Sequence, residues 1–122
     1  FRRSLYAVKE IKRVIQACTA LDKGDIETLG KLMFETHQGL SKDYEVSCAE
    51  LDYLVDLAIA EEDVIGSRLM GGGFGGCTIN LVKKGSESKI KEKFTTLYAE
   101  HFKIDLITYD VKVSNGTSLY KN

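Results

Sequence analysis

Apolar residues recur every three or four positions through the first forty residues, the spacing that places them on one face of a helix. One helix is predicted from Ser4 to Leu21, ending before Gly24, and Asp25 is placed to cap a second. The apolar face of the first helix consists of Leu5, Val8, Ile11, Ile15 and Cys18, and that of the second of Ile26, Leu29, Met33, His37 and Leu40. Gly30 costs the second helix about 1 kcal/mol relative to Ala, so we expect a close neighbour there.

Two further helices are predicted in the second half of the chain. Ser47 and Glu50 have the spacing of a capping box, so a third helix begins there, and the acidic run 61–63 beyond it reads as a solvated face. A fourth helix begins at Gly85-Ser86. The inward residues are Leu51, Leu54, Val55, Ala58 and Ile59 in the third helix, and Ile90, Phe94, Leu97, Tyr98 and His101 in the fourth.

Alternation of apolar and polar residues predicts three strands. These are Val64 to Met70, Cys77 to Lys83, and Asp105 to Ser114, the last with Ile107, Tyr109, Val111 and Val113 facing inward. Four helices with about three strands, two of them joined by a short turn, predict an α+β fold: an antiparallel sheet of about three to four strands with helices on one face. The helix between the second and third strands fits a ferredoxin-like plait.

The turn between the first two strands is rich in glycine. Five of the six residues from 71 to 76 are glycine, which costs backbone entropy and buries little, so folding stability alone is a poor reason for the run. Gly71, Gly73 and Gly76 match the dinucleotide-binding pattern, but that pattern must open a helix, whereas a strand follows here. A protein-kinase glycine loop needs Val at the position of Thr78 and a later V-A-I-K lysine, and neither is present. Two interpretations stay open: a tight hairpin, or backbone that faces an anion or ligand.

Composition limits the classes of function. With 122 residues the chain is long enough for one domain with a proper core. Its net charge of −1 and its lack of a basic run give no electrostatic sign of binding to nucleic acid or to an anionic membrane. No apolar stretch is long enough to span a membrane. Cys18, Cys48 and Cys77 are far apart, and we expect them to be small buried residues of a cytoplasmic protein.

Two motifs together resemble a known family. The segment D-Y-E-V-S-C-A-E-L-D at 43–52, paired with G-S-R-L-M-G-G-G-F-G-G-C-T at 66–78, is similar to the C-terminal domain of galactokinases, which are sugar kinases of the GHMP superfamily. The resemblance covers nearly the whole chain. Two positions depart from the family pattern: Leu69-Met70 stands where the family usually has Met-Thr, and Ala49 stands where it has Pro.

The resemblance implies transfer of the γ-phosphoryl group of ATP, with Mg²⁺ bridging phosphates, to the C1 hydroxyl of galactose. It places the turn near the sugar and the transferring phosphoryl group, with Gly72 nearest. The expected substrate-proximal residues are Gly71, Gly72, Gly73, Phe74, Gly75 and Gly76, and the possible cleft-lining residues are Asp43, Tyr44 and Arg68. We expect no catalytic residue and no metal ligand in this chain.

The same resemblance bears on the rest of the protein. The chain opens at Phe1 and enters a helical pattern at once, so we expect residues 1–122 to be the C-terminal domain of a longer kinase whose N-terminal domain binds ATP. Alone it should be inactive and bind no cofactor. Three alternatives stay open: a galactokinase-like sugar sensor, a kinase for a related sugar such as N-acetylgalactosamine, and a free-standing ligand-binding module.

Overall fold

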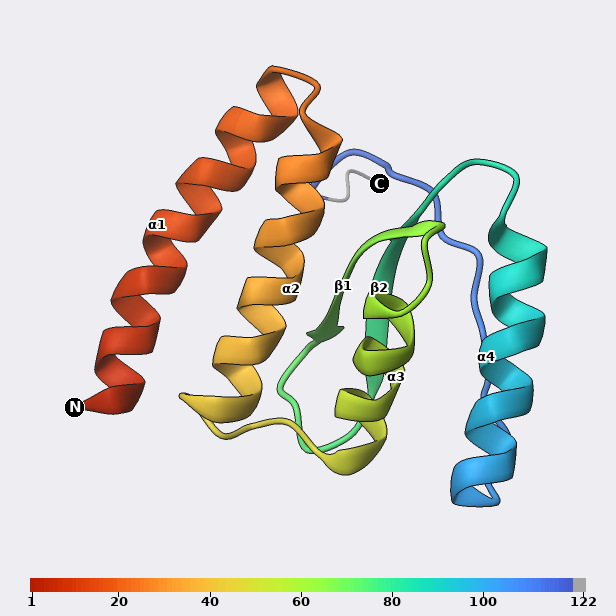
Figure 1. The fold of residues 1–122 in the computed structure, drawn as a ribbon. Coiled ribbons are helices and arrows are strands. Elements are labelled where there is room, and N and C mark those ends of the chain that lie inside the picture. Colours follow the sequence, from red (N-terminus) through yellow and green to blue (C-terminus); the bar gives the residue numbers. More distant parts are fainter. Residues whose placement is uncertain (120–122) are drawn as a thin grey trace.

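The computed structural model describes residues 1–119. Two helices come first, followed by a third helix, a two-stranded antiparallel sheet and a fourth helix (Figure 1). Ser67 pairs with Asn80 and Leu69 with Thr78, and the register is irregular between Val64 and Gly66. The elements are α1 (Arg2–Asp22), α2 (Ile26–Lys42), α3 (Ala49–Ile59), β1 (Val64–Met70), β2 (Cys77–Val82) and α4 (Glu87–Phe102).

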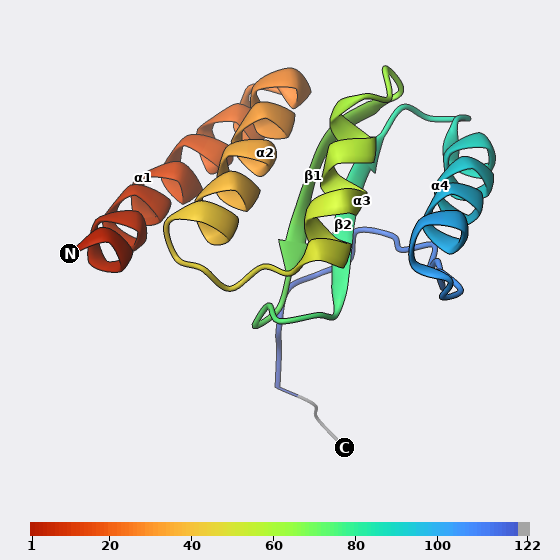
Figure 2. The same ribbon diagram turned by 60° about the horizontal axis from the view of Figure 1, so that its bottom comes forward.

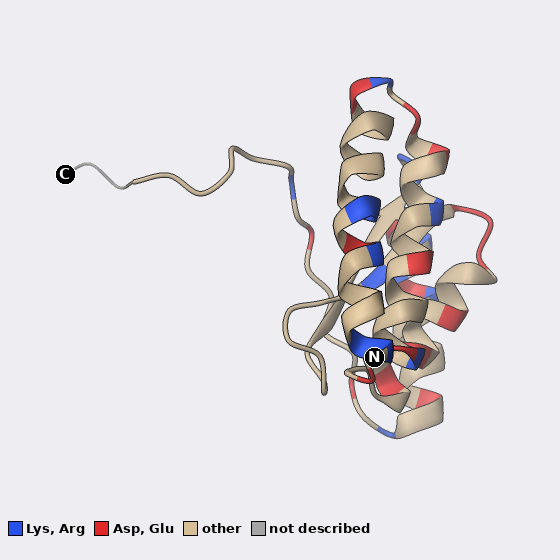
Figure 3. Ribbon diagram, turned by 90° about the vertical axis from the view of Figure 1, so that its left-hand side faces the viewer, with Lys and Arg blue, Asp and Glu red and all other residues tan. Residues whose placement is uncertain are grey.

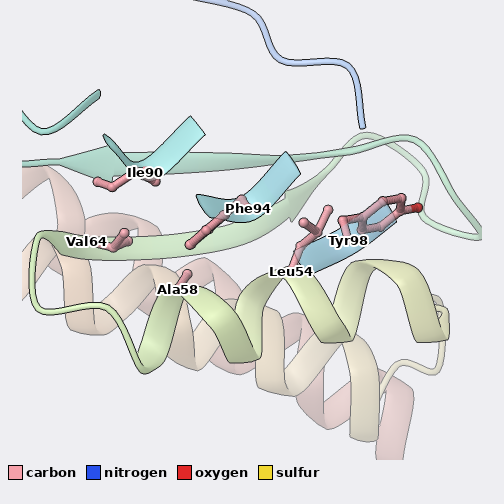
Figure 4. Close-up of a cluster of buried hydrophobic side chains, with 6 residues drawn as sticks. All are labelled: Leu54, Ala58, Val64, Ile90, Phe94 and Tyr98. Atoms are coloured by element: carbon pink, nitrogen blue, oxygen red, sulfur yellow. The ribbon is translucent and has the colours of Figure 1, made fainter. Parts of the chain in front are cut away.

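The helices flank and cover the strand pair. Helices α1 and α2 lie on the β1 side, α3 lies over the strands, and α4 lies on the β2 side (Figures 1 and 2). The main apolar cluster joins α3, β1 and α4 (Figure 4). Its buried members are Leu54, Ala58, Val64, Ile90, Phe94 and Tyr98. The α+β class and the antiparallel pairing predicted from the sequence are therefore confirmed.

Helix α2 packs against the backbone of β1, at the glycine where the sequence predicts a close neighbour. A Cβ added to Gly30 would lie 2.7 Å from the carbonyl carbon of Ile65 and even nearer its oxygen. A Cβ added to Gly66 would lie 2.5 Å from the Cα of Gly30. Glycine is thus required on both sides of this contact, because there is no room for a side chain.

The first turn of α2 has a side-chain cap, whereas that of α3 has none. The predicted cap of α2 is confirmed, since the Asp25 carboxylate accepts a hydrogen bond from the Thr28 N–H at 3.0 Å. The predicted capping box of α3 is wrong. Its N-cap is Cys48, which makes no side-chain cap, and the Ser47 hydroxyl instead donates to Asp52 at 2.6 Å.

The third predicted strand, and with it the plait of three to four strands, is not found within residues 1–119. Residues 105–114 form no strand, and Ile107 and Tyr109 are 71% and 77% exposed. Leu106 packs against the apolar cluster and Asp110 pairs with Lys91 of α4, and the chain end beyond them runs away from the helices (Figure 3). Alternation alone does not make a strand, because its N–H and C=O groups need a neighbouring strand as partner.

The apolar face predicted for α1 is present, and it lies on the outside of the molecule. Leu5, Val8, Ile11 and Ile15 are exposed, whereas Tyr6 and Ala20 are the buried residues of this helix. Periodicity shows that a helix has an apolar face but does not say what that face meets.

Two further predictions about burial are wrong. Glu61, expected in a solvated acidic run, is only 5% exposed and forms ion pairs with Lys89 and Lys93 of α4. The hydrogen bond from Lys93 holds the pKa of Glu61 below its ordinary value. Cys18 and Cys77, expected to be buried, are exposed.

The length and apolar composition of the helices were compared with those of membrane-spanning helices. Across residues 1–119, none combines the length and the apolar composition needed to cross a membrane.

Replacing Gly30 by Ala tests the contact between α2 and β1. In an open helix this change would stabilise by about 1 kcal/mol. Here the new Cβ would press on the backbone of Ile65, which no rotamer change can relieve, so we expect a net loss of about 2 kcal/mol. The measurement is urea unfolding followed by circular dichroism. Gly72→Ala is the control, because nothing lies within 4 Å of its added Cβ. Equal stability of both variants would contradict the close packing.

Candidate functional site

The glycine-rich turn joins β1 to β2, as the sequence predicts. Gly71, Gly73, Gly75 and Gly76 all have positive φ angles, between 81° and 129°, which glycine adopts without steric cost. Phe74 also has a positive φ of 60°, and its side chain is 76% exposed. The run is thus a hairpin turn and not the start of a helix.

The turn is anchored to the segment that precedes α3. The Phe74 N–H donates to the Val46 carbonyl at 2.7 Å. A Cβ added to Gly73 would lie 2.9 Å from the Cβ of Val46 and closer still to its carbonyl oxygen. The backbone of Glu45 is itself left-handed, and its carboxylate pairs with Arg2 and Arg3 of α1. The two sequence motifs are therefore in direct contact.

Other glycines of the turn meet nothing within the described chain. A Cβ added to Gly71, Gly72 or Gly75 would find no atom within 4 Å. Positive φ explains glycine at Gly71 and Gly75, but Gly72 has no such φ. Neither backbone conformation nor packing against residues 1–119 requires glycine at position 72.

A cavity of about 260 Å³ lies beside the turn. The start of α3, the second half of the turn, α4 and the segment after α4 form its walls. Its lining residues are Cys48, Glu50, Leu51, Leu54, Phe74, Gly75, Gly76, Tyr98, Ile104 and Leu106. A small molecule that reached the turn from this side would meet apolar side chains and one carboxylate.

A buried hydrogen-bond network connects α2 to the strand that enters the turn. The Leu69 N–H donates to Nδ1 of His37 at 3.1 Å. Nδ1 therefore carries no proton, and Nε2–H donates to the Asp52 carboxylate at 3.0 Å. Asp52 also accepts hydrogen bonds from Ser41 at 2.9 Å and from Ser47 at 2.6 Å. These bonds join α2, α3, the Val46 segment and β1 next to the turn.

The charges within this network are set by burial and by hydrogen bonds. Burial lowers the pKa of His37, and the nearby Asp52 only partly offsets this effect. Burial alone would raise the pKa of Asp52, but hydrogen bonds from Ser47, Ser41 and His37 outweigh it and hold the pKa below its ordinary value. A neutral imidazole beside an ionised carboxylate is the resulting arrangement at neutral pH.

The three residues predicted to line a cleft make local contacts within this chain, and their role at a cleft stays a prediction. Tyr44 packs on Tyr6 of α1 with ring centroids 5.3 Å apart, and the N–H of Asp43 donates to the carbonyl of Gly39 at the end of α2. Arg68 donates to the Leu69 carbonyl at 3.4 Å. None of the three lines the cavity. Sequence reasoning missed the roles of His37 and Asp52, although a histidine at an inward helical position was a usable signal.

Metal binding has no ready-made site among the described residues. Within residues 1–119, no three His, Cys, Asp or Glu side chains come together in a way that could hold a metal ion.

The protonation of His37 predicts a pH dependence of stability. Below its ordinary pKa of 6.5 the unfolded imidazole binds a proton, whereas the folded imidazole binds one only at lower pH. The unfolded state then binds more protons, so the free energy of unfolding falls as pH drops from about 7 to about 5. His37→Gln should flatten this fall, and it should cost about 1–3 kcal/mol at neutral pH.

The measurement is urea unfolding at a series of pH values for both proteins. Nitrogen chemical shifts of the imidazole should independently report the tautomer that is protonated at Nε2. A His37→Gln variant with the same pH slope as the parent would contradict the assignment.

Comparisons with known proteins agree with the two motifs. The family model for the GHMP kinases C terminal matches residues 8–100. The galactokinase of Thermotoga maritima is 45% identical over 115 residues, which are 94% of this chain and 33% of that protein. Human galactokinase is 54% identical over 83 residues, which are 68% of this chain and 21% of that protein.

A solved structure is similar as well. The galactokinase of Lactococcus lactis, crystallised with galactose, superposes with a TM-score of 0.82 at 35% identity, and the match covers 85% of this chain and 27% of that one. The chain spans about a third of the length of the Thermotoga relatives. The family-model match, which covers well over half of the residues, shows that the chain belongs to the GHMP kinase C-terminal family.

Proposed function

We propose that this chain works as the C-terminal domain of a galactokinase that transfers the γ-phosphoryl group of ATP to the C1 hydroxyl of galactose. Similarity to galactokinases over 94% of the chain supports the reaction class. The complex named for the Lactococcus lactis relative contains galactose, which supports the acceptor. The observation that carries the proposal is Gly72, whose lack of a side chain nothing within residues 1–119 explains.

In this proposal the tip of the turn approaches the sugar and the transferring phosphoryl group. Phosphoryl transfer depends mainly on positioning and on electrostatic stabilisation. Peptide N–H groups at Gly71 and Gly72 can face an anion directly, because no Cβ keeps it at a distance. A methyl group at Gly72 would displace the acceptor, and displacement by about 1 Å can cost about a hundredfold in rate.

The remaining parts of the chemistry belong to the rest of the kinase. We propose that the ATP site, the ligands of Mg²⁺ and the catalytic residues lie in the N-terminal domain, which would also be the partner of this chain. The chain alone should then release no ADP in the presence of galactose. An ATP-dependent sugar kinase of this kind would act in the cytoplasm.

A hybrid enzyme tests this function. It consists of the Thermotoga maritima galactokinase with its matching third replaced by this chain, to which that third is 45% identical. We expect Gly72→Ala in the hybrid to lower kcat about a hundredfold while leaving the melting temperature unchanged, since its Cβ enters open space in this chain. Gly72→Ser should act in the same direction.

Gly73→Ala is the matched comparison. Its Cβ would press on Val46 and its φ is 81°, so both stability and activity should fall. Galactose-dependent ADP release measures activity, and thermal unfolding measures stability. Full activity of the Gly72→Ala hybrid would overturn the role of the turn. In the full-length protein to which this chain belongs, turnover with N-acetylgalactosamine but not galactose would change the substrate, and sugar binding without turnover would favour a sensor.

A further inference from the structure

Helix α1 presents an apolar surface to the outside of the molecule. Ile11 and Ile15 are 65% and 63% exposed, and the residues above and below them on the same face are exposed too. Helix α1 lies at the edge of the molecule, with α2 on its inner side (Figures 1 and 2). We refer to this surface as the outer stripe, which consists of Leu5, Val8, Ile11, Ile15 and Cys18.

Contacts on the inner face fix the rotation of α1. The Tyr6 ring packs directly against Gly39 of α2. A side chain at Gly39 would collide with the ring, because its Cβ would lie 2.7 Å from Cδ2 of Tyr6. Glu10 accepts a hydrogen bond from Thr36 of α2 at 2.9 Å and pairs with Arg13, which also reaches Glu35 at 3.4 Å.

Turning the helix to bury the outer stripe would break these contacts. It would also separate the Glu10 carboxylate and the Arg13 guanidinium from their present partners on α2. The outward position of the stripe is therefore specified by the sequence of α1 and is not an arbitrary orientation.

A continuous row of exposed apolar side chains marks an interaction surface. A lipid surface is disfavoured by charge, because three of the five basic residues of α1 are already paired: Arg2 and Arg3 with Glu45, and Arg13 with Glu10 and Glu35. Only Lys9 and Lys12 remain beside the stripe without an ion pair among the described residues, and the whole chain carries a net charge of −1. The complementary surface should thus be apolar and uncharged, like a protein core.

We propose that the outer stripe of α1 is the surface on which the remainder of a full-length galactokinase chain packs. The inference rests on the proposed function, in which this chain is one part of such an enzyme. Matched galactokinases are about three to four times as long as the region they share with this chain, since that region is 33% of the Thermotoga protein and 27% of the Lactococcus chain. The residues outside that region supply the covering surface.

Cys18 offers a direct probe, because it lies in the stripe and is exposed. Its rate of alkylation by iodoacetamide is followed by mass spectrometry in this chain alone and in the hybrid enzyme. We expect the hybrid to protect Cys18 at least about tenfold. Free glutathione added to each sample serves as the reference for reagent and conditions, because Cys77 lies beside the turn that the proposed function places near the substrate.

A pair of variants provides a second readout. Ile11→Lys with Ile15→Glu puts one charge of each sign into the stripe, and Lys12→Glu with Gln16→Lys places one charge of each sign at exposed positions beside it. The stripe variant should leave the melting temperature of this chain alone unchanged and lower that of the hybrid by roughly 5 °C or more. The control variant should leave the melting temperatures of both proteins unchanged.

Each other outcome overturns the proposal. Equal alkylation of Cys18 in both proteins, or a hybrid that tolerates the stripe variant, would show that the stripe faces solvent in the enzyme. A defined dimer of this chain that the stripe variant dissociates would assign the stripe to a second copy. Stripe-dependent binding to anionic phosphatidylserine vesicles would assign it to a lipid surface.

Two safeguards keep the test decisive. If the hybrid does not fold, Cys18 labelling is repeated on this chain mixed with the separately produced remainder of the Thermotoga maritima enzyme, where an unchanged rate overturns the proposal. Protection and melting do not depend on turnover. A folded hybrid that protects Cys18 but lacks activity would therefore refute the proposed function alone.

Discussion

The close approach of α2 to β1 is the constraint on which the rest of the structure depends. Gly30 and Gly66 lie backbone against backbone, with no space for a side chain on either. This contact brings His37, two turns further along α2, to the N–H of Leu69. A strand edge that would otherwise present an unsatisfied donor is thereby covered by a helix and by an imidazole nitrogen.

The same contact controls the position of the glycine-rich turn. Leu69 lies two residues before Gly71, so the His37 network holds the strand where it enters the turn. Through Asp52 the network also holds Ser47, whose neighbour Val46 binds the N–H of Phe74 in the middle of the turn. The turn is fixed at two points, while the space around Gly71, Gly72 and Gly75 stays open. Such a turn can meet a ligand without reorganising, which is what precise positioning requires.

Helix α1 shows how polar contacts can decide which way a helix faces. A hydrogen bond from Thr36 to Glu10, the pairing of Arg13 with Glu10 and Glu35, and the packing of Tyr6 on Gly39 hold the polar side inward. The apolar side is left outside. Exposure of that side has a cost, since burial of apolar area is the main favourable term in folding. The arrangement makes sense for a chain whose relatives are three times as long as the shared region.

The sequence by itself determined the elements whose causes are local. Helical spacing and the Asp25 cap predicted α2, the change to alternation predicted β1 and β2, and the glycine run between them predicted a turn. Gly30 also predicted a close neighbour, because a glycine inside a helix lowers the stability of the helix, and close packing must offset this loss. The sequence motifs of the turn and of its anchoring segment could also be identified from the sequence. They indicated the family that the comparisons show.

The tertiary structure decided everything that depends on a partner distant in sequence. Ser47 could cap α3 or bind Asp52, and in the folded chain its hydroxyl donates to Asp52, which His37 also contacts. Residues 105–114 have the pattern of a strand but no neighbouring strand within residues 1–119, and α1 has an apolar face that its own polar contacts turn outward. Periodicity records which side chains share a face. What that face meets is set by the sum of contacts across the whole fold, and no local pattern contains that sum.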